Sequence, residues 1–151
     1  FLLIKYWLNN KKIILYKDPK NTYINKFVFF GIGSAVLLVI HSIFLGIKFE
    51  YELYKLFRRV VILFFIVFEI IAQTYLVICL YKIRYSISEN INEIFLKLKI
   101  FLVSLLIIVA LISIPIISVP GNKYLKHALE WDYFVGVISF YLLTFFMWKK
   151  N

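Results

Sequence analysis

Hydrophobic residues gather into four long runs that are separated by short polar segments. The runs cover residues 27–47, 60–81, 100–119 and 129–148. Each has about the 20 residues that a helix needs to cross a hydrocarbon layer roughly 30 Å thick, and none shows the alternation typical of a strand. An open strand in lipid would leave its backbone groups without hydrogen bonds. The pattern therefore predicts an all-α integral membrane protein, a bundle of four transmembrane helices.

The composition agrees with a membrane setting. Of the 151 residues, 63% are hydrophobic, more than the roughly half that is usual in soluble domains. The mean hydropathy is +0.88. The net charge is +10, but the basic residues lie between the apolar runs, as they do at the flanks of spans, and not along one nucleic-acid-binding face. We expect the lipid bilayer, and in one interpretation other membrane subunits, as partners, and no nucleic acid.

The positions of Lys and Arg predict the orientation. With four spans, one side holds residues 1–26, the loop 82–99 and the C-terminal tail, which together carry twelve Lys and Arg. The other side holds the loops 48–59 and 120–128, which carry six. Because cytoplasmic segments carry the excess of basic residues, both termini of this multi-pass chain are predicted to be cytoplasmic.

The same pattern divides the chain into three parts. Residues 1–26 are predicted to form a basic cytoplasmic arm with a turn at Asp18-Pro19, residues 27–148 the transmembrane domain, and residues 149–151 a cytoplasmic tail. The chain begins with Phe1 and not with Met, which suggests a start inside a longer protein.

Glu69 is the sharpest single feature, because it lies near the middle of the second run. It is about 14 Å from the outer end of that span at 1.5 Å per residue, and a carboxyl group at this depth has to face protein or water, or carry a proton. Gln73 lies one turn further along the same face. We predict an intramembrane polar group of Glu69, Gln73 and His41, which lies at a similar depth in the first run. It serves either as a proton relay or ligand anchor, or only as a polar contact that sets the register of two helices.

A second polar group opens the fourth run, within the stretch KYLKHALEWDYF. It consists of His127, Glu130, Trp131 and Asp132, which we call the outer-face seam. Tryptophan settles at the level of lipid headgroups, and an acidic side chain in the first turn of a helix gains about 0.3–1 kcal/mol from the helix dipole. These effects account for the residues without catalysis. If Glu130 turned inward towards Glu69, the seam would instead be a site.

Small residues predict where helices approach closely. Gly31 and Ser34 in the first run, and Gly136 in the fourth, allow neighbouring backbones to come together. Pro115 predicts a kink in the third helix. The tryptophans, Trp7 among them, fall at or beyond the ends of the runs and are predicted to lie at the headgroups.

No motif demands catalysis, a metal or a cofactor. The chain has no glycine-rich phosphate loop, no nucleophile elbow and no HExxH zinc motif. Its one cysteine, Cys79, excludes an internal disulfide and a cysteine metal cluster. An enzyme would have to work from Glu69, Glu130, Asp132 and the two histidines, and their spacing does not require it. We expect no metal and no cofactor, and the absence of a motif favours a non-enzymatic protein while leaving an enzyme open.

The last run carries a recognisable pattern, in which His127 precedes the pair Glu130-Trp131 and the stretch FYLLTF follows from Phe140 to Phe145. This pattern resembles the final helix of the DRAM/Frag/Sfk family of multispanning membrane proteins. The resemblance implies six spans with cytoplasmic ends, of which the four runs here would be the last four. It also implies a role in membrane trafficking, autophagy regulation or lipid organisation, with no catalytic residue to carry over. The gap between the histidine and the glutamate is shorter here than in the family.

Three functions remain open at this point. The first is a non-enzymatic membrane protein of the DRAM/Frag/Sfk type that contacts lipid or a membrane partner through the outer-face seam. The second is an accessory subunit of a larger membrane complex, and the third is a small lipid-modifying enzyme or transporter that uses the intramembrane Glu/His pair. A closed, dry contact between His41 and Glu69 would favour the second function. A water-accessible cavity linking Glu69 to Glu130 and Asp132 would favour the third. Lipid-facing surfaces on all four helices, with few protein contacts, would speak against the second.

Overall fold

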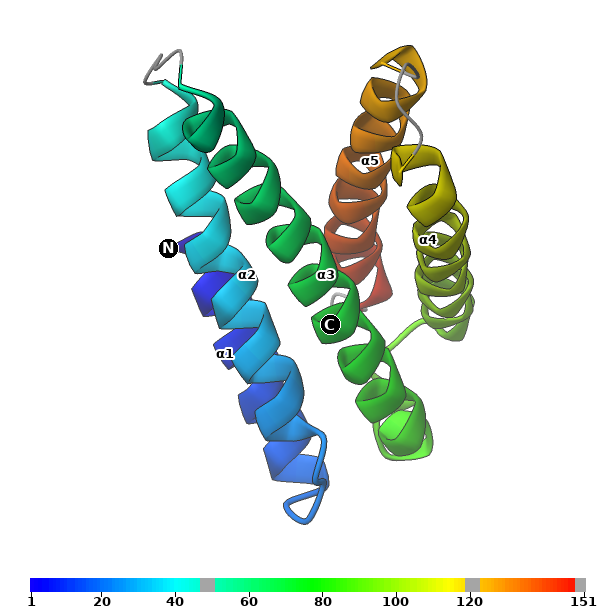
Figure 1. The fold of residues 1–151 in the computed structure, drawn as a ribbon. Coiled ribbons are helices and arrows are strands. Elements are labelled where there is room, and N and C mark those ends of the chain that lie inside the picture. Colours follow the sequence, from blue (N-terminus) through cyan, green and yellow to red (C-terminus); the bar gives the residue numbers. More distant parts are fainter. Residues whose placement is uncertain (47–50, 119–122, 149–151) are drawn as a thin grey trace. The chain divides into compact units, whose positions relative to one another are not determined.

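The structure, a computed structural model, describes residues 1–46, 51–118 and 123–148, and these residues are almost entirely helical. Contacts between residues divide the chain into two compact units, Phe1–Cys79 and Leu80–Asn151, which we take one at a time. The helices, drawn in Figure 1, are α1 (Leu2–Lys17), α2 (Ile24–Leu45), α3 (Glu52–Ile83), the short 3-10 helix η1 (Arg84–Ile87), α4 (Glu93–Ser118) and α5 (Lys123–Met147).

Helices form in all four regions where the apolar runs predicted them, but they begin earlier than the runs. α3 begins at Glu52, eight residues before the second run, and α5 begins at Lys123, six residues before the fourth. The extra turns are polar or mixed in sequence and were predicted as loops. α4 continues past Pro115 to Ser118.

Three of these helical regions are long and apolar enough to cross a membrane, within the part of the chain that the structure describes. They are Ile24–Phe44, Glu52–Ile87 and Glu93–Ser113. In α5 the segment Trp131–Met147 is apolar but shorter. The all-helical class is therefore confirmed, whereas the count of four spans stays a prediction.

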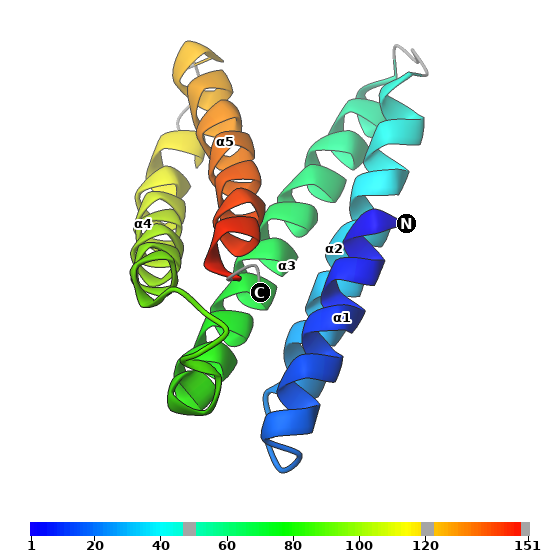
Figure 2. The same ribbon diagram turned by 180° about the vertical axis from the view of Figure 1, so that it is seen from behind.

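The predicted arm contains a helix. α1 packs against α2, as Figure 2 shows from behind, and buries Trp7, Asn10 and Ile14. These residues are spaced as one face of a helix. Trp7 is fully buried, because Gly31 of α2 leaves room for its ring, and its predicted level at the headgroups stays a prediction. A Cβ atom on Gly31 would lie 2.3 Å from the indole.

The turn between α1 and α2 follows from its proline. Pro19 disfavours helical dihedral angles at the residue before it, and Asp18 accordingly has φ −142° and ψ 81° and ends α1. The Asn21 side chain then accepts a hydrogen bond of 3.0 Å from the Tyr23 backbone N–H, and α2 begins at Ile24. The turn predicted at Asp18-Pro19 is thus present.

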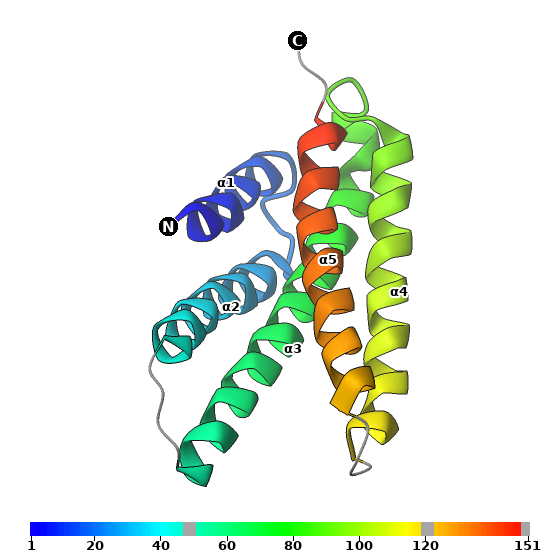
Figure 3. The ribbon, with the colours of Figure 1, turned by 90° about the horizontal axis from the view of Figure 1, so that it is seen from above.

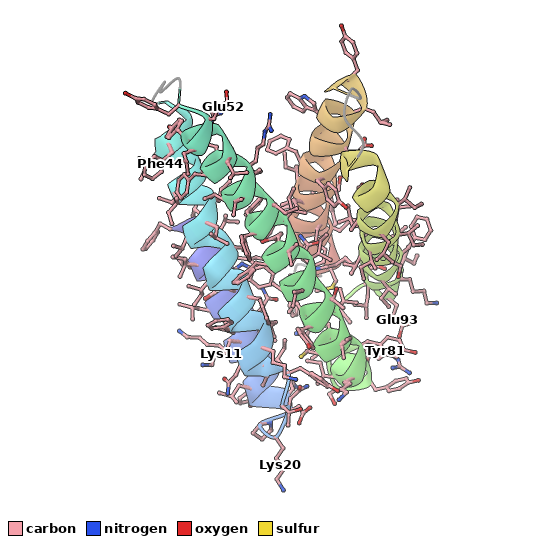
Figure 4. All side chains as sticks on the ribbon, viewed as in Figure 1. Lys11, Lys20, Phe44, Glu52, Tyr81 and Glu93 are labelled. Atoms are coloured by element: carbon pink, nitrogen blue, oxygen red, sulfur yellow. The ribbon has the colours of Figure 1, made fainter. Side chains whose placement is uncertain are left out.

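α2 and α3 form an antiparallel pair in the first unit, and aromatic contacts give its register. Near the connection, Phe44 lies against Phe57, with ring centroids 5.2 Å apart. At the other end, Tyr23 stacks on Tyr75 at 5.6 Å. Figure 4 labels Phe44 at the first of these ends and Lys20 beyond the second. Residues earlier in α2 therefore lie beside residues later in α3.

In the second unit, α4 and α5 also form an antiparallel pair (Figure 3). The Asn92 side chain accepts a 3.0 Å hydrogen bond from the Ile94 backbone N–H, which caps the start of α4. The Asn92 backbone N–H donates to the carbonyl of Met147, which ties this end to the end of α5. Further along, Gly136 of α5 packs on Leu106 of α4, whose Cδ2 atom would lie 2.5 Å from an added Cβ. Gly136 therefore makes a close helix contact.

Candidate functional site

The first buried polar cluster joins α2 to α3 and is centred on Glu69. Glu69 is 1% exposed, and Ser34 and Gln73 are fully buried. The Ser34 hydroxyl lies 2.6 Å from Glu69 Oε2. The Gln73 Nε2 amide, one turn along α3, donates to Glu69 Oε1 at 2.9 Å. Both carboxyl oxygens are therefore engaged by side chains of the same helix pair.

The hydrogen atoms in this cluster can be counted. Ser34 Oγ also lies 2.9 Å from the Gly31 carbonyl oxygen. A serine hydroxyl has one hydrogen, so it can donate to that carbonyl and to the carboxylate together only by sharing this hydrogen in a bifurcated bond. If Glu69 carries a proton, Glu69 can donate to Ser34 while Ser34 donates to the carbonyl. The geometry accommodates either arrangement.

The structure brings together Glu69 and Gln73 from the predicted group, and it adds Ser34. The partner that we expected on α2 was His41, which is half-buried. By the register of the hairpin, His41 faces the stretch 57–62 of α3, at least seven residues or about 10 Å along the axis from Glu69. Ser34 is thus an α2 side chain that contacts Glu69, and the pairing with His41 stays a prediction.

The second buried polar cluster joins α4 to α5 and was not predicted. Lys99 is fully buried, although we had counted it as a basic residue of the cytoplasmic loop. Its Nζ donates to Thr144 Oγ1 at 2.5 Å and lies 4.0 Å from the centre of the Phe140 ring. Thr144 in turn donates to the Phe140 backbone carbonyl at 3.0 Å. Lys99 forms no ion pair with any described carboxylate.

A signal for Lys99 was present in the sequence. Leu96, Val103 and Leu106 are buried on one face of α4, and Lys99 lies on the same face by its spacing of three and four residues. Starting the third span at residue 100 hid this periodicity. Extending the helix back to the asparagine cap at Asn92 would have shown a lysine inside the apolar stripe.

The outer-face seam belongs to α5, although not to its first turn as we expected. Trp131 is 65% exposed and packs edge-to-face on Phe134, with ring centroids 5.9 Å apart. Asp132 is exposed as well. The side chains of His127 and Glu130 lie outside the described residues, so the predicted inward turn of Glu130 stays a prediction.

Other features of the described residues point to packing. The Cys79 thiol is buried and lies 3.6 Å from the Asn21 side-chain oxygen. Among the residues that the structure describes, no group of three or more His, Cys, Asp or Glu side chains has an arrangement that could hold a metal ion. The two clusters are hydrogen-bonded contacts inside helix pairs, and their chemistry is that of helix association.

Comparison of the chain with protein families, with characterised proteins and with solved structures finds no match in any of the three.

Proposed function

We propose that this chain is a non-enzymatic integral membrane protein that contacts lipid or a membrane partner through the outer surfaces of its helices. One observation carries the proposal. In each of the three long apolar segments, no more than 33% of the most apolar stretch is buried within the chain. Large apolar side chains remain exposed along all of them, among them Phe29 of α2, Leu63 of α3 and Phe101 of α4. A surface of this kind requires lipid or other membrane helices to cover it.

The buried polar clusters support a role without catalysis. In lipid, helices are held together by close packing and by hydrogen bonds between polar side chains. The hydrophobic effect does not drive their association, because lipid chains are as apolar as the helix surfaces. The Glu69 and Lys99 clusters each join two neighbouring helices, and each ionisable group is enclosed. An enzyme or transporter that used Glu69 would need water or substrate to reach it, whereas Glu69 is 1% exposed.

The finer parts of the proposal come from the sequence. α5 is proposed as the fourth span, and both ends of the chain as cytoplasmic, because of the distribution of Lys and Arg. The pattern of His127, Glu130-Trp131 and FYLLTF supports membership of the DRAM/Frag/Sfk type. On this proposal the exposed Trp131 anchors the outer-face seam at the headgroups.

Two measurements test this function. After expression in cells, the protein should stay in the membrane pellet through alkaline carbonate washing and be released only by detergent. Release by carbonate alone would contradict membrane insertion.

Orientation can be measured by thiol labelling, because the one native cysteine is buried. In a Cys79→Ala background, single cysteines are introduced as Lys20→Cys, Tyr124→Cys and Asn151→Cys. We expect an impermeant thiol reagent to label only Tyr124→Cys from outside intact cells, since α2, α3 and α4 separate it from Lys20 and α5 separates it from Asn151. Labelling of Tyr124→Cys and Asn151→Cys from the same side would show that α5 does not span.

A further inference from the structure

A pocket separate from both buried clusters lies at the end of α3, within the second unit. Its volume is about 240 Å³, and it is lined by Tyr81, the 3-10 helix η1 and the first two turns of α4. Figure 4 labels Tyr81 and Glu93, which line it from α3 and from α4. Pockets that enclose a drug-sized molecule measure about 300–1,000 Å³, so this one suits a smaller group.

Arg84 forms one wall of the pocket and is held in place by two tyrosines. Its guanidinium carbon lies 3.9 Å from the centre of the Tyr81 ring and 4.2 Å from that of Tyr85. Two nitrogens donate to the Tyr81 carbonyl at 2.9 Å and to the Tyr85 hydroxyl at 2.8 Å. A guanidinium has five N–H groups, so three remain for a ligand. The side chain is therefore held in one orientation before a ligand binds.

The opposite wall carries a base and an acid that do not bind each other. Glu93 and Lys97 are one turn apart on α4, a spacing and order that favour an ion pair. Their charged atoms nevertheless do not come within 4.0 Å, and neither side chain bonds to any other described residue. The pocket therefore contains two cationic groups and one carboxylate, none of them neutralised by a partner within the described chain.

We propose that this pocket binds the headgroup of a glycerophospholipid that carries both a phosphate and a primary amine. Arg84 and Lys97 supply charge-assisted hydrogen bonds to the phosphate, for which a guanidinium is well shaped. Glu93 accepts from the ammonium group. The two positive charges and one negative charge match a phosphate joined to an amine more closely than a phosphate alone.

The position of the pocket supports a lipid as the source of the phosphate. It lies where two candidate spans meet, at the end of Glu52–Ile87 and the start of Glu93–Ser113. Leu96 and Ile100 form its apolar side. Leu96 is buried, but exposed apolar side chains such as Phe101 and Ile108 follow further along α4, in the span. Acyl chains can follow this surface while the headgroup occupies the pocket. The inference rests on the proposed membrane function, since it takes these segments as spans.

Lipid binding in detergent tests the inference. The full-length protein is purified in a phospholipid-free detergent, and native mass spectrometry measures binding of phosphatidylethanolamine and of phosphatidylglycerol with the same acyl chains. Wild type should bind phosphatidylethanolamine more tightly. Lys97→Gln should weaken both lipids by about tenfold, the loss of one charged hydrogen bond. Glu93→Gln should abolish the preference for the amine-containing lipid, and Lys20→Gln, at an exposed lysine in the α1–α2 turn, should bind as wild type does.

Three results would overturn the proposal. They are equal binding of the two lipids by wild type, unchanged binding by Lys97→Gln, and displacement of the lipid by inorganic phosphate at an equal concentration, which would assign the pocket to free phosphate. Lys97 makes no bond within the described chain, so its variant should keep its helical circular dichroism. Because the assay works in micelles, its failure leaves the carbonate result standing. Release by carbonate would instead overturn the proposed function whatever binds in micelles.

Discussion

Among the described residues, the first unit buries a carboxyl group between two helices and the second unit an amino group, and the two groups are held in different ways. In the first unit, the Glu69 carboxyl group is bound by a hydroxyl from α2 and an amide from its own helix. In the second, the Lys99 ammonium group is bound by one hydroxyl and by the face of an aromatic ring. The acid is held by directed hydrogen bonds, whereas the base is held partly by a ring that offers no directed bond.

The two clusters differ in which neighbouring groups would lose a hydrogen bond if Glu69 or Lys99 were removed. Without Glu69, the buried Gln73 amide loses the acceptor of its Nε2 group, and its Oε1 atom already has no hydrogen-bond partner. Without Lys99, Thr144 keeps its hydrogen bond to the Phe140 carbonyl, and the Phe140 ring keeps its packing. A buried donor or acceptor left unsatisfied costs more than the bond itself was worth. We therefore expect substitution of Glu69 to lower the free energy of unfolding more than substitution of Lys99.

The largest expected difference concerns the glycines at the helix contacts. In Gly31→Ala the new methyl group meets the buried indole of Trp7, a rigid ring, at 2.3 Å. In Gly136→Ala it meets the end of the Leu106 side chain, which can rotate away. We expect Gly31→Ala to lower the free energy of unfolding by about 2–3 kcal/mol and Gly136→Ala by less than about 1 kcal/mol, measured by chemical denaturation in micelles. Equal losses would show that both units pack with the same rigidity.

The second prediction concerns Glu69. Glu69→Leu should lower the free energy of unfolding by about 1–2 kcal/mol, because it leaves the Gln73 amide without its acceptor. Glu69→Gln is the matched control, since its amide can donate to Ser34 as a protonated carboxyl group does. We expect it to stay within about 0.5 kcal/mol of wild type in the same titration. A large loss in Glu69→Gln would mean that the negative charge is required.

The smallest expected effect is that of Lys99→Met. The variant loses one hydrogen bond and the contact with the Phe140 ring, but it also removes a polar amino group from an enclosed position and keeps most of the side-chain volume. These effects oppose each other, so the free energy of unfolding should change by no more than about 1 kcal/mol. A loss as large as that of Glu69→Leu would remove the contrast between the two units.

Much of the fold could be predicted from hydropathy, but the ends of the helices could not. The apolar runs marked the regions of α2, α3, α4 and α5, because only helices satisfy the backbone of such long apolar segments in lipid. The polar first turns of α3 and α5 lie outside the runs. α1 was missed because its buried face is narrow and includes Asn10 among its three buried residues. Hydropathy averages hide a face of this kind.

The candidate site was predicted in part. The position of Glu69 in the middle of an apolar run singled it out, and helical spacing placed Gln73 beside it, but position along the run alone could not select the partner on α2. That choice depends on the register of two helices, which is set by aromatic contacts such as Phe44 with Phe57. Lys99 was missed because a lysine beside an apolar run is normally taken as a flank.

The contact between Ser34 and Glu69 also constrains the number of residues between Phe57 and Glu69 on α3. An α-helix turns by about 100° per residue, so one residue inserted in α3 after Phe57 would leave the ring contact with Phe44 in place. It would rotate the Glu69 carboxyl group by about 100° away from α2. Descendants of this chain can therefore exchange most of the apolar residues between Phe57 and Glu69, but we expect them to keep the interval of twelve positions. The angle around α3 between Phe57 and Glu69 has to be conserved more strictly than the identity of the side chains between them.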